Sequence, residues 1–532
     1  MGRPGVAGLR SARLLAVAVL LFLLAAALYV RLPGYDGRPL WIDELWRVNL
    51  ILDPDLPRRY FSSPDVYTAI TSPLYAAFTR TIALFGRSPE VLRLGSLLPG
   101  LAAVAVAFLL ALRARAGLLA AAAASLAFAL NADFVRYSNE LKPYAFEVFV
   151  HLACVLALLD LLLLPEVSRG RWTAFFTVLA AALLSAANAV TLLPAIAAAV
   201  LLHARLSPEA SLREPLAGFA GLAGLAALMY FFVWSHGSDK DLIRYWAWGF
   251  NSDGAGHYPG FLAERFREMW KAAFSLVGER SVGMPFHRTA LAALLAAAAC
   301  HFVYPRQFVA GIGARIVLFY FVFFAILACL NYLGMWPLGA LRPNLFVYAH
   351  FIALVFLLIA SIPSRLARGA ICLVLLAELA ATLALVSRPQ LESASAPLER
   401  HDLVLRAFGP EESAGKRITA QCRTAKPLVF FNPGMSHALA YYRGVATMRE
   451  SEASMLLGDC VDLRAMPDAY VDLARARSAI ASAASGAPFW VVYSHIDRGD
   501  PEYRVMRDLL AEFGELRTAE SFSGAGYFEV ER

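Results

Sequence analysis

The chain has 532 residues, of which 59% are hydrophobic and 17% are charged, and its formal net charge is +7. Soluble domains carry roughly 25% charged residues, so the composition excludes an ordinary soluble protein and predicts a polytopic α-helical membrane protein. Arginine-rich short connections account for much of the positive charge, and we expect no nucleic-acid partner.

Apolar stretches long enough to cross a bilayer recur about eleven times. They fall near residues 12–31, 90–112, 116–134, 143–164, 172–187, 189–204, 214–235, 288–304, 315–333, 344–362 and 367–386. The part from 172 to 204 could form one long helix, but Asn188 in its middle favours a tight hairpin.

Basic residues alternate between the connections. Pairs such as Arg113 with Arg115 and Arg365 with Arg368 follow every second stretch. With eleven spans these pairs share one side with the N-terminal tail, which the positive-inside rule assigns to the cytoplasm. The first stretch lacks a small-residue cleavage pattern and is interpreted as a retained helix. Residues after about 388 are therefore expected outside, as in a multi-pass membrane protein.

The first outer connection, residues 32–89, contains two adjacent carboxylates, Asp43 and Glu44, flanked by Trp41 and Trp46. One interpretation is a solvated acidic turn beside interfacial tryptophans, an arrangement common at membrane surfaces. The other is a functional pair, because adjacent carboxylates at a membrane surface are costly to hold and suit proton transfer or metal binding. This segment alone favours neither interpretation.

A second polar segment joins the third and fourth stretches. Its ionisable residues include Asp133, Arg136, Glu140 and Lys142. Pro143 suits the first turn of a helix, so Tyr144 is expected to open the next span and Glu147 to lie one turn into it. An ionisable group at that depth indicates function by default. Arg136 and Glu140 could also form a local ion pair at the surface.

Two later outer connections are less specific. Arg342, before the tenth stretch, could grip a phosphate or anchor a helix end among lipid headgroups. The connection 236–287 mixes aromatic and charged residues and includes His257. That mixture suits a sugar, but a helix resting on the bilayer surface has the same composition.

The segment 389–532 has ordinary soluble composition and follows a transmembrane domain of residues 1–388. Strand-like runs at 427–431, 489–493 and 527–530 and helix-like runs at 468–484 and 502–512 predict a small α/β domain. Cys422 and Cys460 are the cysteines of this segment and are candidates for a disulfide. The remaining cysteines, Cys154, Cys300, Cys329 and Cys372, are expected to be small buried hydrophobic residues.

Three motifs in register resemble one family. The pair Asp43-Glu44 resembles the first outer loop of membrane glycosyltransferases of the GT-C fold. Ser72-Pro-Leu-Tyr75, Leu84-Phe-Gly86 and Val91-Leu-Arg-Leu-Gly-Ser96 are similar to the family's PPLYY, LFG and ALRL.S motifs. Arg136-Tyr-Ser-Asn-Glu-Leu-Lys-Pro-Tyr144 resembles its RYS.EARPY signature, with Lys142 in place of arginine. Together they match the bacterial branch of the protein O-mannosyltransferase and lipid A aminoarabinose transferase superfamily (glycosyltransferase family 39-like), mainly over residues 10–165.

The chain also departs from the family pattern. Ala187–Val190 stands where the family commonly has a His-Tyr pair, and Ser72 replaces the first proline of its motif. These departures concern the donor and acceptor more than the type of reaction.

The resemblance implies an inverting transfer of a sugar from a polyprenyl phosphate to a hydroxyl of a glycan, lipid or protein on the outer face. It implies Asp43 as the base, with Glu44 orienting the acceptor or sharing a divalent cation, the one cofactor left open. Residues implied to hold the lipid phosphate are Arg136, Lys142 and Arg342. Residues implied to line the substrate site are Glu140, Tyr144, Glu147, Tyr348 and His257. The alternative is a flippase or transporter of lipid-linked or small polar substrates, although no internal repeat is seen.

Overall fold

The computed structural model divides the chain into two compact units. It describes residues 6–35, 40–53, 72–164, 167–206, 213–235, 246–251, 254–278, 285–303, 313–394, 428–431, 461–462, 477, 480–481, 489–494, 501–522 and 525–531. The first unit comprises Met1–Asp36, Tyr60–Gly86 and Val91–Ser395, and the second comprises Gly37–Arg59, Arg87–Glu90 and Ala396–Arg532. The boundary predicted at residue 388 stays a prediction.

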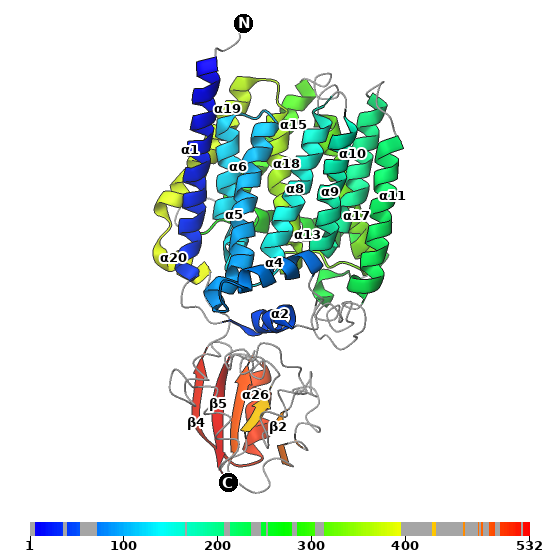
Figure 1. Cartoon of the computed structure of the whole chain (residues 1–532). Helices are drawn as coiled ribbons and strands as arrows, with labels where there is room; N and C mark the ends of the chain where they lie inside the picture. The colour runs from blue at the N-terminus through cyan, green and yellow to red at the C-terminus, as the bar shows by residue number, and fades with distance from the viewer. Residues whose placement is uncertain are drawn as a thin grey trace. The chain divides into compact units, whose positions relative to one another are not determined.

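Long apolar helices lie side by side in the first unit (Figure 1). They are α1 (Val6–Arg31), α5 (Pro89–Arg113), α6 (Leu118–Leu130), α8 (Tyr144–Leu162), α9 (Arg169–Ser185), α10 (Leu192–Leu206), α11 (Arg213–Met229), α15 (Phe286–Val303), α17 (Gly313–Tyr332), α18 (Leu345–Ala360) and α19 (Arg365–Leu385). Within the described residues, nine segments are long and apolar enough to cross a membrane. α6 and α9 are shorter, at 13 and 17 residues. The polytopic helical fold predicted from the sequence is confirmed.

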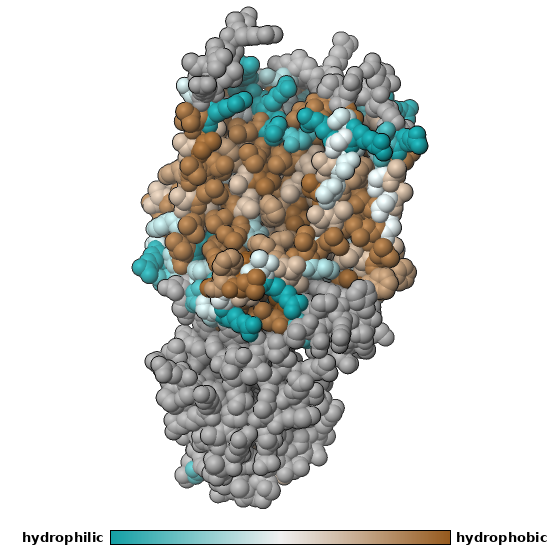
Figure 2. Space-filling model, viewed as in Figure 1, coloured by the Kyte–Doolittle hydropathy of each residue, from teal (hydrophilic) through white to brown (hydrophobic). Residues whose placement is uncertain are grey.

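The surface of this bundle is apolar, as lipid contact requires. Figure 2 shows hydrophobic side chains over the helices and hydrophilic ones gathered toward their ends. Phe22 on α1, Phe321 on α17 and Leu373 on α19 are 65%, 70% and 57% exposed. In water, apolar surface on this scale would drive association, whereas lipid tails cover it at no cost.

α18 lies at the centre of the bundle. In the most apolar part of this span 89% is buried, compared with 22% for the span of α1 and 17% for the span of α11. It packs against α6, α8, α15, α17 and α13 (Tyr258–Ala273). Side chains that α18 shares with α8 are therefore shielded from lipid as well as from water.

Short elements connect the long helices. They are η1 (Leu32–Gly34), α4 (Pro73–Ala83), α7 (Ala132–Ser138), η2 (Ala187–Thr191), η3 (Tyr230–Trp234), η5 (Ala247–Gly249), η6 (Ala255–His257), η7 (Arg342–Asn344) and α20 (Arg388–Ala394). η2 separates α9 from α10, so the stretch 172–204 forms two helices, as Asn188 indicated.

The second unit contains α2 (Ile42–Leu52) and a five-stranded mixed sheet in the order β2-β1-β3-β5-β4. The elements are β1 (Leu428–Phe431), β2 (Val461–Asp462), β3 (Phe489–Ser494), α26 (Pro501–Ala511), β4 (Glu515–Phe522) and β5 (Ala525–Glu531). β1 pairs in parallel with β2 and β3, and β5 pairs antiparallel with β3 and β4. Met506 and Leu510 of α26 share a buried core with Val491 and Phe528 of the sheet.

The predicted α/β domain is thus confirmed, with β1, β3, β5 and α26 close to their expected positions. The expected helix at 468–484 is described only at residues 477, 480 and 481, and Cys422 and Cys460 lie outside the described residues. One expectation is wrong in the first unit. Cys329 is exposed and Cys300 is half-buried, because both lie on outward faces of their helices, whereas Cys154 and Cys372 are buried.

Candidate active site

The short helix α7 carries two of the charged candidates, Asp133 and Arg136, and Asn131 fixes its position. The Asn131 side-chain oxygen accepts a hydrogen bond from the Phe134 amide at 2.9 Å, which caps the helix. The Asn131 amide nitrogen donates to the carbonyl oxygens of Ala272 and Ala273 at 2.9 and 3.0 Å. One buried side chain therefore joins α7 to the end of α13.

The turn after α7 is held just as firmly. Asn139 donates to the Arg31 carbonyl at 2.9 Å, and the Ser96 hydroxyl donates to the Lys142 carbonyl at 2.9 Å. Arg31 itself is fully buried and donates to the Ala129 carbonyl at 3.0 Å, at the end of α6. Lys142 is 6% exposed within this turn. α1, α5 and α6 thus fix the segment that the family motif covers.

Arg136 and Glu140 form the local ion pair that the sequence left open. The Arg136 Nε lies 3.1 Å from Glu140 Oε1, and the Glu140 side chain is 1% exposed. Burial acts to lower the pKa of Arg136, but Glu140, Tyr137 and Asp133 together outweigh burial and raise that pKa above its usual value. The pair uses Nε, and in the described part of the chain no hydrogen bond engages the two terminal nitrogens. Those nitrogens can still bind an anion.

Asp133 is the ionisable residue to which the sequence assigned no role. Burial raises its pKa from 3.8 to about 6, the Arg136 guanidinium opposes the rise, and the Glu140 carboxylate adds to it. Tyr348 of α18 lies within electrostatic reach of Asp133. An acid with a perturbed pKa beside an arginine marks this end of the bundle as a candidate site.

Aromatic rings surround these charges. The Arg136 guanidinium lies 5.4 Å from the Tyr137 ring centre, and that ring meets Tyr144 edge-on at 5.3 Å. Burial, followed by the Glu140 carboxylate, raises the pKa of Tyr137, which keeps this phenol neutral. The Tyr348 hydroxyl donates to the Leu341 carbonyl at 3.4 Å. The structure therefore brings Tyr144 and Tyr348, both predicted to line the substrate site, to the charged cluster.

Arg342 lies in η7, directly before α18. Its guanidinium is 5.6 Å from the Trp246 ring centre, a distance that suits a cation–π contact. His257 lies in η6 with its side chain exposed. The roles predicted for Arg342 and His257 both stay predictions.

Glu147 opens a buried polar chain that the sequence did not predict. Its Oε2 accepts a hydrogen bond from the Asn188 amide nitrogen at 2.8 Å. Asn188 Oδ1 lies 3.0 Å from His151 Nε2, and His151 Nδ1 lies 3.0 Å from His350 Nε2. The sequence offered one signal, since Glu147 and His151 are four residues apart on a helix.

Asp43 and Glu44 lie in the first turn of α2, in the second unit. Glu44 is fully buried, and its Oε2 accepts a hydrogen bond from the Trp41 amide at 3.2 Å. This is the way a residue at the third helical position caps its own helix. Asp43, at the second position, is partly exposed. The two neighbouring carboxylates therefore differ in their surroundings, since Glu44 caps the start of α2.

Metal binding has little support. Within the described residues, no group of three or more His, Cys, Asp or Glu side chains is arranged to hold a metal ion. Asp43 and Glu44 would offer two carboxylates, and Glu44 already binds the Trp41 amide. We therefore assign no step to a cation.

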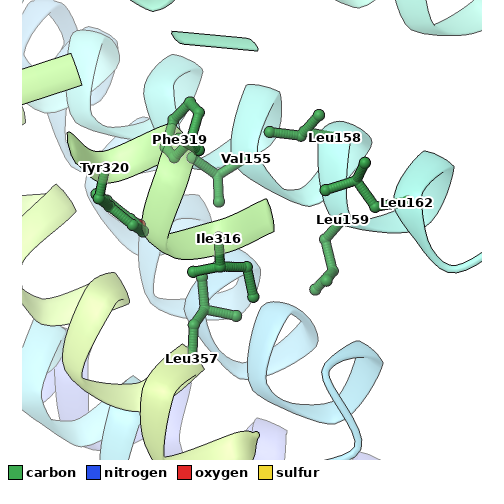
Figure 3. Close-up of a pocket in the computed structure, with 8 residues that line it drawn as sticks. All are labelled: Val155, Leu158, Leu159, Leu162, Ile316, Phe319, Tyr320 and Leu357. Carbon is green, nitrogen blue, oxygen red and sulfur yellow. The ribbon is translucent and has the colours of Figure 1, made fainter. Parts of the chain in front are cut away.

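An apolar pocket opens between α8, α17 and α18. It is lined by Val155, Leu158, Leu159, Leu162, Ile316, Phe319, Tyr320 and Leu357 (Figure 3). Tyr320 has the one polar group among these side chains, so the pocket does not suit a phosphate or a sugar. Val155 lies eight residues beyond Glu147, about 12 Å further along α8.

The fold and the charged cluster define a class of protein. It is a multi-pass helical membrane protein with ionisable residues buried at one end of an apolar bundle. No protein-family model and no curated protein matches the sequence. Several solved structures, however, match the structure of this chain. The oligosaccharyltransferase of Archaeoglobus fulgidus, crystallised with a tethered acceptor peptide, is similar at a TM-score of 0.51 and 12% identity. The alignment covers 97% of this chain and 74% of that one.

The particular fold is GT-C, the fold of that oligosaccharyltransferase, as the sequence motifs implied. ArnT from Cupriavidus metallidurans also matches, at 16% identity over 97% of this chain and 98% of that one, with a TM-score of 0.44. Its form bound to undecaprenyl phosphate matches at the same TM-score and identity.

Proposed function

We propose that this chain is a membrane glycosyltransferase that moves a sugar from a polyprenyl phosphate to an acceptor hydroxyl. The observation that carries the proposal is the charged cluster of α7 and the following turn at one end of a GT-C bundle, in which Glu140 and Lys142 are buried. Ionisable groups in such a place are costly to keep and indicate function by default. The GT-C fold, shared with an oligosaccharyltransferase, supports the same reaction class.

The donor is held by its phosphate. The terminal nitrogens of Arg136 can bind two phosphate oxygens at once, because a guanidinium presents paired donors. Lys142, six positions later, adds a second positive charge, and Arg342 adds a third. In the transition state negative charge builds up on the departing phosphate, so these cations stabilise it more than the ground state.

The acceptor is activated by a carboxylate, and we assign this role to Asp43. The acceptor oxygen attacks the anomeric carbon while its proton passes to Asp43. The bond from that carbon to the phosphate oxygen breaks, and its electron pair leaves with the polyprenyl phosphate. A phosphate is a weak base and needs no general acid to depart. One displacement inverts the configuration at the anomeric carbon.

The cellular setting follows from the arginine-rich connections. We place the N-terminus in the cytoplasm, the α/β domain outside the bacterial inner membrane, and the reaction on the outer face. The donor then arrives within the lipid, so the chain needs no domain for a nucleotide sugar. The partners are a polyprenyl-phosphate-linked sugar, membrane lipid, and an acceptor glycan, lipid or protein.

Mass spectrometry of glycolipids and glycoproteins from cells with and without the chain tests this proposal. A transferase leaves a covalently modified acceptor that is absent without the chain, and its mass names the sugar. A flippase or transporter would change the location of a substrate without forming a glycosidic bond. If no modified acceptor distinguishes the two cell lines, the transferase assignment is wrong.

A further inference from the structure

The hydrogen-bond chain behind Glu147 joins three parts of the bundle. Glu147 and His151 lie on α8, Asn188 on η2 and His350 on α18, and the last three side chains are at most 3% exposed. Two of the three contacts join residues 37 and 199 positions apart in the sequence. Helices in a membrane can be joined by such bonds, each worth roughly 0.6–2 kcal/mol.

The direction follows from donors and acceptors. An ionised carboxylate only accepts hydrogen bonds, so the Asn188 amide nitrogen must face Glu147, as it does at 2.8 Å. Asn188 Oδ1 then faces His151 and only accepts, so His151 must carry its proton on Nε2. His151 Nδ1 is left as an acceptor, and His350 must donate to it from Nε2. Every donor in the chain points toward Glu147.

The far end of the chain agrees with this direction. His350 Nδ1 is then a lone-pair acceptor, and in the described residues no donor reaches it. The ring centre of Phe323 lies 4.2 Å from that of His350, and the Tyr320 ring lies 5.8 Å away. Both rings are fully buried beside these aromatic side chains, which disfavours an imidazolium at either residue, and two imidazolium ions 3.0 Å apart would also repel, so both histidines are neutral. The chain therefore starts at an uncharged imidazole and ends at a carboxylate.

The exposed end of the chain is the carboxylate. Glu147 is partly exposed in the first turn of α8, one turn beyond Tyr144 of the charged cluster. A carboxylate repels phosphate but accepts hydrogen bonds from hydroxyl groups. In a site where Arg136 and Lys142 attract the anion, Glu147 suits the hydroxyls of the sugar carried by that phosphate.

We propose that Glu147 binds hydroxyl groups of the transferred sugar, and that Asn188, His151 and His350 are positioning residues that hold its carboxylate ionised and correctly aimed. This inference rests on the proposed glycosyltransferase function. It adds a substrate-binding carboxylate and explains three buried polar residues that the mechanism above does not use.

The first test reads the direction of the chain without any substrate. Full-length protein labelled with nitrogen-15 histidine is reconstituted in bilayers, and the imidazole tautomers are read by solid-state NMR. His151→Gln and His350→Gln assign the two signals by their loss. We expect both residues neutral and protonated on Nε2. We expect Glu147→Ala to give His151 a second tautomer, because Asn188 can then turn over. A proton on His151 Nδ1 in the wild type, or an imidazolium at either residue, overturns the proposal.

The second test separates positioning from stability. Protein in nanodiscs receives a lipid extract containing polyprenyl-phosphate sugars together with a membrane extract as acceptor source, and release of polyprenyl phosphate is measured. Asn188→Ala and His151→Phe should lower kcat by roughly 10–100-fold, the effect of slight misplacement. Binding of undecaprenyl phosphate alone should be unchanged, because it carries no sugar. His151→Gln keeps a donor at the Nε2 position and should stay within about threefold of wild type.

The matched control is His301, another buried histidine, which contacts the Ser361 hydroxyl at 3.0 Å at the other end of α18. His301→Phe should lower thermal stability and leave the kcat of folded protein unchanged. Asn188→Ala and His151→Phe could lose activity only in proportion to the loss of folded protein, as expected for His301→Phe. In that case the hydrogen bonds behind Glu147 are only structural. The inference then fails, while the proposed transferase function still stands. If wild-type protein releases no polyprenyl phosphate, the proposed function fails. The tautomers of His151 and His350 still test the direction of the hydrogen bonds in that case.

Discussion

At the scale of single residues, Asp43 and Glu44 occupy different environments although they are neighbours. Glu44 is fully buried and accepts a hydrogen bond from the Trp41 amide, whereas Asp43 is partly exposed. Both lie near the positive end of the α2 dipole, which stabilises negative charge. Their removal should therefore have separable effects.

Glu44→Ala should lower the free energy of unfolding by about 1 kcal/mol, because it removes the cap of α2. Glu44→Gln keeps an acceptor oxygen and should cost less. Thermal unfolding of the purified protein in detergent measures both. Equal losses for the two variants would show that the charge of Glu44, rather than its hydrogen bond to Trp41, carries the stability.

Asp133 should make stability depend on pH. Its pKa is raised from 3.8 to about 6, so the folded state holds the proton more tightly than the unfolded state. The free energy of unfolding should therefore fall as pH rises from about 4 to about 6, by at most about 3 kcal/mol, and level off above.

Asp133→Asn should remove most of this dependence of the free energy of unfolding on pH. Asp160→Asn is the control and should leave the pH dependence unchanged, because Asp160 lies beside Arg113 at the other end of α8. Denaturant unfolding at a series of pH values measures the slope. A wild-type stability that rises over the same range would contradict the shift.

Sequence reasoning found the residues that motifs contain and missed those that only folding brings together. Arg136, Glu140 and Tyr144 lie within nine positions, so one motif names them all. His151 and His350 are 199 positions apart. Within apolar spans a histidine has no neighbouring pattern to reveal a partner on another helix, and Asn188 indicated only a turn.

At the scale of elements, hydropathy alone predicted the long apolar helices, because a bilayer demands about twenty apolar residues in a row. It did not predict α13, which has 16 residues and lies within the expected connection 236–287. The sheet was predicted less completely. β1 and β3 are runs of aliphatic and aromatic residues. β4 is an edge strand in which polar residues predominate, and β2 has two residues, so neither has the pattern of a buried strand.

The contact between α5 and α7 offers a test at this scale. A Cβ added at Gly100 would collide with the side chain of Ser138 on α7, so the two elements meet only because residue 100 is glycine. Gly100→Ala should push α7 away, lower the free energy of unfolding by about 1–3 kcal/mol, and reduce polyprenyl phosphate release.

Gly224→Ala on α11 is the matched control, since nothing lies within 4 Å of its added Cβ. It should leave activity unchanged and stability equal or slightly higher. Unfolding and turnover measured on both variants decide the matter. Full activity in folded Gly100→Ala would mean that the position of α7 does not govern the reaction.

At the scale of the whole molecule, an apolar helical bundle carries a cluster of charged side chains at one end, in which Glu140 and Lys142 are buried. Its helices expose hydrophobic residues where lipid lies, and keep Asp133, Arg136 and Glu140 at the ends of α6 and α8. Such an arrangement suits a substrate that is itself part lipid and part anion. A polyprenyl phosphate has this character, and the proposed reaction leaves it as the product.

Release of polyprenyl phosphate therefore tests the central claim most directly, since it needs no knowledge of the sugar or the acceptor. Wild-type protein and Asp43→Asn in nanodiscs are given a lipid extract containing polyprenyl-phosphate sugars, with a membrane extract as the acceptor source. We expect the wild type to release polyprenyl phosphate. Asp43→Asn should release at least roughly 100-fold less, the contribution of a general base, yet bind undecaprenyl phosphate equally well. Full release by Asp43→Asn would contradict the account.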